Sequence, residues 1–216
     1  MASKLSVVAT PIGNLEDITL RALRILKEVD VVACEDTRMT KKLLSHYDIH
    51  TQVTNLKGVP TLLEQGRHVA LVSDAGTPGL SDPGLEIVSK AREAGAAIEV
   101  IPGPSALAAA ISIAGLRAPT FTFYGFLPLK KGRETLFKEI AASERASAFY
   151  ESPHRILKAL TMLAKLLPPE RRVGVFRELT KLHEESFVGS AAEALEHTTA
   201  DPNKQRGEFV VIVEES

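Results

Sequence analysis

The sequence predicts an α/β fold in two domains. In the first half of the chain, short apolar runs alternate four times with segments of helical periodicity, which is typical of a parallel sheet with helices on both faces. The pattern changes beyond 116–119, where an alternating strand pattern takes over. A length of 216 residues is enough for two domains of roughly 100 residues each. We therefore expect an N-terminal α/β domain over 1–116 with a mostly parallel sheet, and a C-terminal α/β domain over 117–216 with a mixed sheet.

In the first domain, apolar runs predict strands that end at polar or Gly/Pro-rich corners, and helix-start signals follow three of them. Asn14 can cap a helix with an acidic first turn. Asp82 can cap another helix that Pro83 begins. Ser105 can cap a third over 106–114, which is apolar on all sides and is therefore expected to be buried. The strands are expected over 5–9, 29–33, 69–72 and 98–101, with shorter helices near 41–47 and 61–65 and no clear periodicity over 48–60.

In the second domain, Ser152 and Pro153 form a good helix start, and an apolar stripe at helical spacing runs from Ile156 to Leu167. A compact basic turn precedes this helix at 130–133. Strands are expected over 121–126, 146–150, 173–176 and 209–213.

The composition is that of an ordinary globular protein, with 44% hydrophobic and 25% charged residues. A net charge of −1 counts against indiscriminate nucleic-acid binding but leaves room for a local basic patch. The single cysteine, Cys34, excludes an internal disulfide framework and indicates a reducing compartment. Because the first apolar run is too short for a signal peptide or a membrane span, we expect a cytoplasmic protein.

Several common catalytic signatures are missing. The corner after the first strand, 10–14, has one glycine where a dinucleotide-binding fingerprint needs three, and there is no phosphate loop. No Cys or His residues have zinc-ligand spacing, so no metal site is expected, and no serine has the context of a hydrolase nucleophile. What remains is three Gly/Pro-rich corners at predicted strand ends, over 11–13, 73–79 and 102–105. They are suited to a ligand bound largely by backbone groups.

The order of these corners and of later motifs resembles the family of bacterial small-subunit rRNA methyltransferase I, the cytidine ribose-2′-O-methyltransferases of the tetrapyrrole-methylase superfamily. The resemblance covers nearly the whole chain. It departs at 48–57, which lacks a His-Glu-His-Asn-like stretch, and at the end of the chain, where many relatives continue in a small helical extension. The matching motifs are Val8-Ala9-Thr10-Pro11-Ile12-Gly13-Asn14, Cys34-Glu35-Asp36-Thr37-Arg38, 73–84, Ile101-Pro102-Gly103-Pro104-Ser105, Tyr124-Gly125-Phe126-Leu127-Pro128, Phe149-Tyr150-Glu151-Ser152-Pro153-His154-Arg155, Arg177-Glu178-Leu179-Thr180-Lys181 and Gly207-Glu208.

The resemblance implies S-adenosylmethionine in a cleft between the two domains, a homodimer, and small-subunit rRNA as substrate, within an assembled ribosomal subunit. Asp74 would accept hydrogen bonds from the cofactor, the helix start at Ser105 would face its polar edge, and Phe149 and Tyr150 would wall its pocket. Each of these residues also has a purely structural interpretation, as a helix cap or a core residue. The cofactor-binding residues so implied are Pro11, Gly13, Asp74, Ala75, Gly76, Thr77, Pro102, Gly103, Ser105, Ala106, Phe149, Tyr150, Gly207 and Glu208.

A ribose hydroxyl is a poor nucleophile, so a base or hydrogen-bond acceptor beside it would help. Glu35 is one acidic residue that could fill this role, beside the candidates named below. Lys181 could act as the base if burial lowers its pKa. Arginines such as Arg177 are suited to phosphate contacts. A salt bridge between neighbouring strand ends is the competing interpretation for each of these charges. The catalytic candidates are Asp36, Arg38, Glu151, Arg155, Glu178 and Lys181.

Two groups of basic residues are candidates for an RNA-binding patch: Lys130, Lys131 and Arg133 in the basic turn, and the pair Arg171 and Arg172. Two other functions remain open at this point. One is a methyltransferase of a tetrapyrrole or other small molecule. The other is an assembly factor that binds the cofactor without catalysis.

Overall fold

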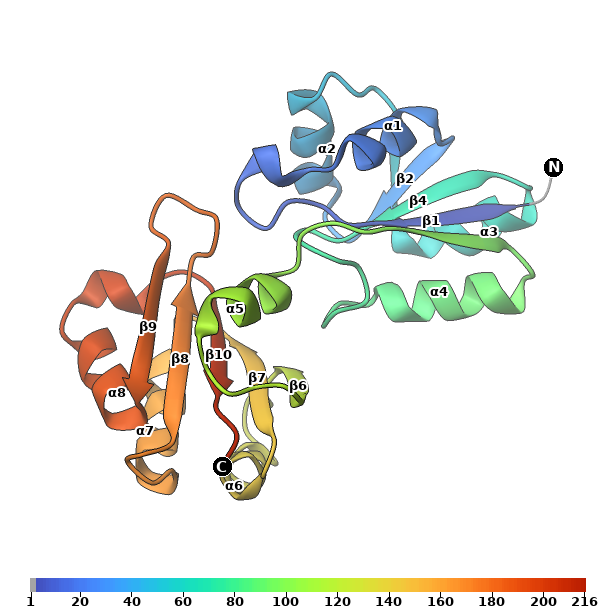
Figure 1. The fold of residues 1–216 in the computed structure, drawn as a ribbon. Helices are drawn as coiled ribbons and strands as arrows, with labels where there is room; N and C mark the ends of the chain where they lie inside the picture. The colour runs from blue at the N-terminus through green and yellow to red at the C-terminus, as the bar shows by residue number, and fades with distance from the viewer. Residues whose placement is uncertain (1–2) are drawn as a thin grey trace. The chain divides into compact units, whose positions relative to one another are not determined.

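The computed structural model describes residues 3–216, which divide into two compact units that meet between Ser105 and Ala106 (Figure 1). The structure thus groups residues 106–114 with the second unit by contacts. The domain boundary expected after residue 116 stays a prediction.

The first unit contains a five-stranded sheet in which all neighbouring strands are parallel. This confirms the fold class expected from the alternating pattern. The strand order is β3-β2-β4-β1-β5, so β4, β1 and β5 lie next to one another. Its strands are β1 (Lys4–Val8), β2 (Val31–Cys34), β3 (Gln52–Asn55), β4 (His68–Val72) and β5 (Ala97–Ile101).

Helices cover both faces of this sheet (Figure 1). On one face, α1 (Leu20–Glu28) and α2 (Thr37–His46) bury Leu26 and Leu44 against strand residues such as Val8. On the other face, α3 (Val59–Glu64) and α4 (Gly84–Glu93) bury residues such as Ile87. Successive strand residues point to opposite faces, which is why near-continuous apolar runs are needed in a sheet that is covered on both sides.

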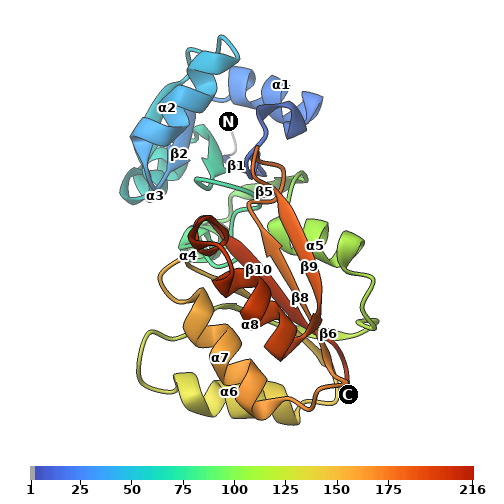
Figure 2. The same cartoon turned by 90° about the vertical axis from the view of Figure 1, so that its left-hand side faces the viewer.

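The second unit contains a mixed five-stranded sheet in the order β6-β7-β10-β8-β9, as expected. Only β6 and β7 run parallel, and the other neighbours are antiparallel. Figure 2 shows α6, α7 and α8 on one face of this sheet and α5 on the other. The elements are α5 (Ala106–Ala114), β6 (Phe121–Phe126), α6 (Arg133–Ala142), β7 (Ala146–Glu151), α7 (Ile156–Leu166), β8 (Arg172–Arg177), β9 (Glu185–Ser190), α8 (Ala191–Thr199) and β10 (Phe209–Val213), with short 3₁₀ turns η1 (Leu15–Asp17), η2 (Leu56–Gly58) and η3 (Pro202–Gln205) elsewhere in the chain.

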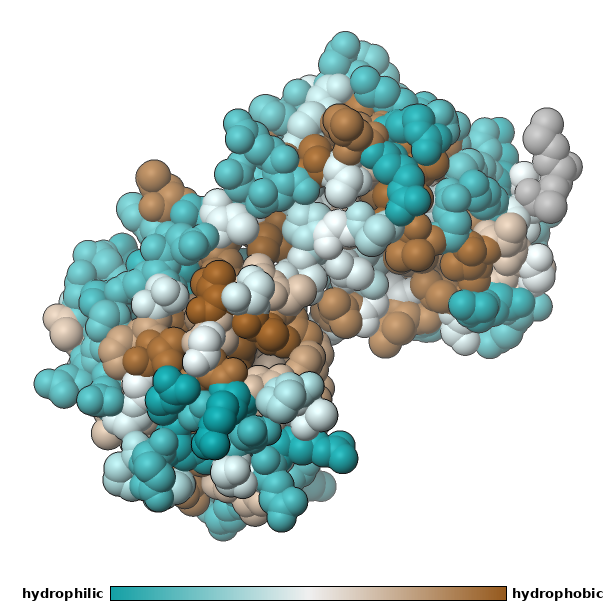
Figure 3. All heavy atoms as spheres, viewed as in Figure 1, coloured by the Kyte–Doolittle hydropathy of each residue, from teal (hydrophilic) through white to brown (hydrophobic). Residues whose placement is uncertain are grey.

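Three local expectations are wrong. Asn14 caps only the 3₁₀ turn η1, because Thr19 accepts a hydrogen bond from Ala22 N and starts α1 there. The cap of α4 is Pro83, one residue later than expected, although Asp82 Oδ1 accepts hydrogen bonds from Gly79 N in the loop and from Gly84 N at the start of α4. Helix α5 is not buried all round: only Ala110 and Ala114 are buried in it. Apolar side chains gather over α5 on the surface of the second unit (Figure 3), and Ile113 is half exposed.

Candidate functional site

The three Gly/Pro-rich corners of the first unit form one hydrogen-bonded cluster at the carboxyl ends of β4, β1 and β5. Thr10 and Gly76 exchange two backbone hydrogen bonds, with N···O distances of 2.9 and 3.1 Å. The Thr77 hydroxyl donates to Pro104 O at 3.0 Å, and the Thr10 hydroxyl donates to Ser73 O at 3.2 Å. Because these strands are neighbours, their corners form one continuous surface, which is where parallel sheets bind ligands.

Gly76 is a glycine because of this clustering. Its φ is +80°, and a Cβ atom there would lie 3.2 Å from Ile12 Cγ2. A larger residue would therefore strain the backbone and push the first corner away from the second. The sequence pattern indicates ligand binding as the reason for the glycine at this position. The structure shows that it is needed for the contact between the two corners.

The exposed surface of the cluster consists mainly of backbone, with one carboxylate. Gly13 and Ala75 are exposed, Asp74 is exposed, and Pro11 is buried beneath them. Asp74 Oδ1 accepts a hydrogen bond from Asp36 N at 3.3 Å, which joins the end of β2 to the cluster. On the third corner, Pro102 and Gly103 are exposed, Ser105 is half-buried, and Ala106 begins α5 in the second unit.

Such a surface fits a polar small molecule. Exposed N–H and C=O groups and one carboxylate can bind the amino and hydroxyl groups of a nucleoside-like cofactor. S-adenosylmethionine has these groups, so the residues present fit it.

Asp36 caps α2 and pairs with the side chain of Arg38. Asp36 Oδ1 accepts a hydrogen bond from Arg38 N at 2.8 Å, and Oδ2 lies 2.8 Å from Arg38 Nη2. These hydrogen bonds, chiefly those from the Arg38 guanidinium, lower the pKa of Asp36 to about 2. The geometry therefore favours a fixed anion over a proton acceptor at Asp36.

In the second unit, Glu151 at the end of β7 lies between two arginines. Its side chain is fully buried, with Arg133 Nη2 at 2.5 Å and Arg155 Nε at 2.8 Å. Arg155 also donates to Leu127 O, and Arg133 to Pro128 O, so the triad joins β7 to the loop before α6. This arrangement is the salt-bridge alternative considered for Glu151 and Arg155, and it uses both carboxylate oxygens.

The two aromatic cofactor candidates of β7 point to opposite faces of the sheet. Phe149 is buried in the core below α6, where its ring lies edge-on to Phe137 at 6.2 Å. Tyr150 is half-buried on the other face, against the rings of Phe123 and Phe126 at 5.0 and 5.4 Å. Phe149 is therefore a core residue, and only Tyr150 can contact a ligand.

A second charged cluster follows β8. Lys181 Nζ lies 2.8 Å from Glu178 Oε1 and 2.9 Å from Glu208 Oε2. Burial opposes the charge on Lys181, but the two carboxylates outweigh it and raise its pKa. Burial likewise opposes ionisation of Glu178, but hydrogen bonds from Lys181 and from Glu208 N lower its pKa. The condition under which Lys181 would act as a base is not met, and the lysine is held as a cation.

Gly207 belongs to this cluster through close packing. Its φ is +94°, and a Cβ atom there would lie 2.4 Å from Glu178 Cγ. The end of β7 and the end of β8 flank the same residue of β10, because Glu151 and Arg177 both pair with Phe209. The two charged clusters of the second unit therefore lie at one end of its sheet, two strand spacings or roughly 10 Å apart.

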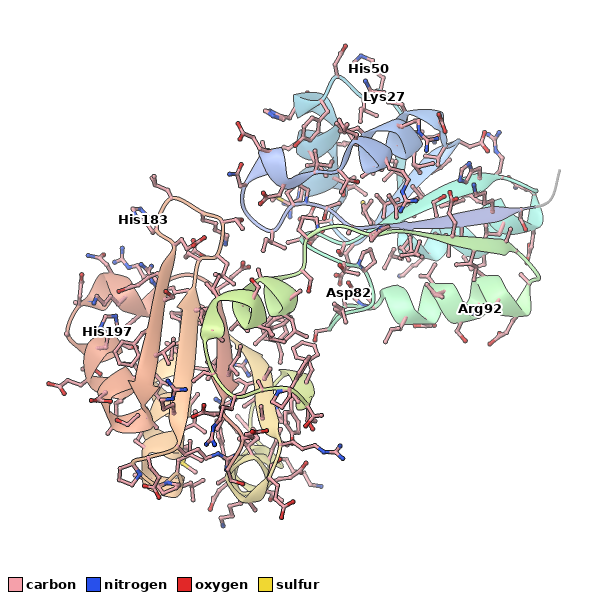
Figure 4. All side chains as sticks on the ribbon, viewed as in Figure 1. Lys27, His50, Asp82, Arg92, His183 and His197 are labelled. Carbon is pink, nitrogen blue, oxygen red and sulfur yellow. The ribbon has the colours of Figure 1, made fainter. Side chains whose placement is uncertain are left out.

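One charged cluster was not predicted from the sequence. Glu185 on β9 binds Arg177 at 3.2 Å, His197 at 2.9 Å and Lys204 at 3.2 Å. With the loops on either side, it lines a cavity of about 790 Å³ that also reaches Glu178. Figure 4 shows His197 on α8 beside β9, and His183 in the loop between β8 and β9. Its members come from four segments, so no local sequence signal marks it.

A buried serine in the first unit also escaped the sequence analysis. Ser6 Oγ lies 2.7 Å from His68 Nε2 and 2.6 Å from Glu99 Oε1. The serine bridges the histidine and the carboxylate instead of being activated by the histidine, and it is fully buried in β1, which lies between β4 and β5. This cluster joins three strands and is not a nucleophilic site.

The two groups of basic residues differ in the structure. Arg171 is buried and donates to three backbone carbonyls, and Arg172 pairs with Glu214 at 2.9 Å. Both are therefore structural. Lys130 and Lys131 are exposed, and neither has an ion-pair partner among residues 3–216.

Residues 3–216 contain no group of three His, Cys, Asp or Glu side chains arranged to bind a metal ion. None of the helices in that range has the length and apolar character needed to cross a membrane.

Comparison with known proteins agrees with this architecture. The sequence profile of the Tetrapyrrole (Corrin/Porphyrin) Methylases matches residues 4–195. Among solved structures, the methyltransferase CobJ has a TM-score of 0.71 at 20% identity and covers 99% of this chain and 95% of its own. Uroporphyrin-III-C-methyltransferase from Thermus thermophilus has a TM-score of 0.67 at 21% identity, with 98% and 94% coverage. At these identities the structural similarity shows the fold. The chain belongs to the tetrapyrrole methylase family, and it is a methyltransferase.

The more similar relatives narrow this assignment. The Ribosomal RNA small subunit methyltransferase I of Thermotoga maritima is 42% identical, over 97% of this chain and 97% of its own length. Its namesake from Halalkalibacterium halodurans is 46% identical, over 97% of this chain and 75% of its own. The one from Escherichia coli O157:H7 is 43% identical, over 98% and 77%. Within the family, the chain therefore falls in the small-subunit rRNA methyltransferase I group, as the sequence motifs indicated.

Proposed function

We propose that this protein transfers a methyl group from S-adenosylmethionine to the ribose 2′-hydroxyl of a cytidine in small-subunit rRNA. One observation carries the proposal: relatives that share this name are 42–46% identical over at least 96% of the chain. The tetrapyrrole methyltransferases are about half as similar in sequence. We also infer that the protein acts in the cytoplasm as a homodimer, on rRNA within an assembled small subunit.

The reaction is an in-line displacement in which a new oxygen–carbon bond forms as the sulfur–carbon bond breaks, and the hydroxyl proton leaves to a base or to water. It depends chiefly on positioning the two reactants. In the first unit, the exposed backbone of the corners and the Asp74 carboxylate bind the donor's polar groups, while the hydrogen bonds between Thr10 and Gly76 keep the corners rigid.

The chain's ionisable residues serve mainly as fixed charges. Asp36 has a pKa of about 2, Arg133 and Arg155 are held in place by the buried Glu151, and Lys181 is held as a cation. Fixed charges of this kind orient the substrate and stabilise charge that develops during the transfer. Glu178 faces the cavity between the β8–β9 loop and η3, where it can accept a hydrogen bond from a ribose hydroxyl.

A methyl-transfer assay tests the proposal. Small ribosomal subunits from cells lacking the gene are incubated with the protein and methyl-labelled S-adenosylmethionine, and the rRNA is digested for mass mapping. We expect one cytidine to gain a ribose methyl. A label on a porphyrinogen precursor and none on rRNA would favour a small-molecule acceptor. Cofactor binding in calorimetry with no transfer would favour an assembly factor.

An Asp74→Asn variant tests the cofactor site. Asparagine keeps an oxygen for the hydrogen bond from Asp36 N but removes the charge. A charge-assisted hydrogen bond contributes about 1.5–3 kcal/mol, so the affinity for S-adenosylmethionine should fall about 10- to 100-fold. An unchanged affinity in calorimetry would remove Asp74 from the site. Glu196→Gln, on the exposed face of α8, is the control.

A further inference from the structure

A basic groove runs between α6 and α7 of the second unit. The two helices lie side by side in Figure 2 and pack against each other. A cavity of about 400 Å³ lies at the start of α6. Its lining residues are Lys130, Arg133, Glu134, Phe137, Lys158, Thr161 and Met162.

The lysines of this groove are not used by the protein's own ion pairs. Lys130, Lys131 and Lys158 are exposed, and none of them has an ion-pair partner within residues 3–216. Glu134 is the one acidic residue that lines the cavity, and Lys138 already binds it at 3.0 Å. The groove therefore has uncompensated positive charge in a chain whose net charge is −1.

Arg133 adds to this charge and fixes its position. Its guanidinium lies 5.2 Å from the centroid of the Phe137 ring and is held by Glu151. Because Glu151 also pairs with Arg155, one carboxylate compensates two arginines, and the triad keeps a net charge of +1. The end of the groove nearest β7 is thus both positive and rigid.

We propose that this groove, lined by Lys130, Arg133 and Lys158 with Lys131 next to it in the sequence, binds phosphates of the rRNA backbone. The inference rests on the proposed function, which supplies a polyanionic substrate. Lysines that have no protein partner bind phosphates without losing an existing ion pair, and contacts of this kind position an RNA without reading its sequence. The groove thus provides a local basic patch, although the net charge of the chain is −1.

The test compares RNA binding across salt concentrations. Fluorescence anisotropy is measured with a labelled hairpin of small-subunit rRNA at KCl from about 50 to 300 mM, a range over which phosphate contacts dominate the change in affinity. The variant is Lys130→Gln/Lys131→Gln/Lys158→Gln. The slope of log K against log salt is negative, and each lost phosphate contact reduces its magnitude by about 0.7–0.9. For the triple variant we expect a slope that is less negative by roughly 2. We expect the Kd near physiological salt to rise about tenfold or more.

Two further variants sharpen the test. Arg145→Gln removes an exposed cation without an ion-pair partner in the described chain, but at the opposite end of α6, and it should leave the Kd and the salt slope unchanged. Glu134→Gln removes the acidic residue from the groove, frees Lys138 and should tighten binding. Wild-type affinity and slope in the triple variant would overturn the inference, as would an equal loss in Arg145→Gln.

Failure of the proposed function would look different. If the wild-type protein binds the hairpin through the groove but methylates no rRNA, the proposed function fails and the groove stands. If the wild-type protein methylates rRNA and the triple variant has an unchanged KM for rRNA, the groove fails and the proposed function stands. Cofactor affinity, measured by calorimetry, should be equal in both proteins.

Discussion

Glu151 offers the sharpest distinction between a structural and a catalytic carboxylate. Its sequence context, after a strand and before Ser152-Pro153, is that of a site residue. The structure buries its side chain completely and places an arginine on each side. A Glu151→Gln substitution keeps the shape and one oxygen acceptor, but it turns the other acceptor into an N–H donor that faces a guanidinium.

The expected cost follows from this geometry. Removing one partner of a buried ion pair costs about 3–5 kcal/mol, because an uncompensated charge stays buried. Ser152 N donates to Glu151 Oε1 at 2.8 Å and can still do so to a glutamine, which favours the lower end of that range. About 3 kcal/mol corresponds to a decrease in Tm of roughly 6–12 °C for a chain of this size.

Thermal unfolding followed by circular dichroism, at pH 7 and without cofactor, measures the effect. The control is Glu196→Gln, which removes an exposed carboxylate without an ion-pair partner among residues 3–216 and should leave Tm unchanged. If Glu151→Gln unfolds at the wild-type temperature while losing methyl transfer, the structural interpretation of the triad is wrong and Glu151 acts in catalysis.

Three other predictions concern packing and pH. Gly207→Ala places a Cβ atom against Glu178 in a left-handed backbone and should cost about 1–3 kcal/mol, measured by urea unfolding. The pKa of Glu214 is lowered from 4.5 to about 2, chiefly by its hydrogen bond with Arg172. Its contribution, about 3 kcal/mol, should be present above pH 4.5 and be lost as pH falls towards 2, and Glu214→Gln should remove that part of the pH dependence. Burial, helped by Lys4, lowers the pKa of His68, so the free energy of unfolding should decrease as pH falls below 6.5, and less so in His68→Gln.

Each of these has an outcome that contradicts it. Wild-type stability of Gly207→Ala would mean that Glu178 moves aside without cost. An acid unfolding curve of Glu214→Gln that overlays the wild type would show that the carboxylate contributes nothing. If the free energy of unfolding depends on pH equally in His68→Gln and in the wild type between pH 7 and 5, His68 does not cause the loss of stability.

The strands that the sequence marks most clearly are those that bury both faces, although the edge strands β5 and β6 were predicted as well. β4, with Val69 to Val72 all buried, and β10, buried throughout, stand out as apolar runs. The strands it missed, β3 and β9, lie at the edges of their sheets and contain only half-buried and exposed residues. An edge strand buries less apolar surface, so its pattern is weak, and its place depends on a neighbour far away in the sequence.

Two helices were missed for different reasons. α6 buries only Phe137 and Ile140 and has no side-chain cap, so local signals are scarce. α8 begins with a capping box formed by Ser190 and Glu193, a signal that is readable in the sequence. Helix α5 was predicted correctly as a helix, but its burial was overestimated. Small apolar residues do not by themselves imply burial.

The corners of the candidate site were predictable, since each is a local motif at a strand end, whereas their mutual hydrogen bonds depend on strand order. The role of the ionisable residues was least predictable. Glu151 meets Arg133 across 18 positions, and Glu178 meets Glu208 N across 30. Distances of this kind decide whether a carboxylate is a base or one half of an ion pair, and no local pattern contains them.

These pairings bear on how methyl transfer proceeds. General-base catalysis typically contributes about 10²–10⁴ in rate and needs a group whose pKa lies near the working pH. Asp36 has a pKa of about 2, and the pKa of Lys181 is raised, so both keep their charge across the neutral range. An electrophile as reactive as a sulfonium methyl needs less help from a base than from alignment with the attacking oxygen. On the proposed function, the rigid corners would bind the donor's polar groups and fixed charges would act on the acceptor side. The lysines without an ion-pair partner among residues 3–216 would remain to bind the RNA.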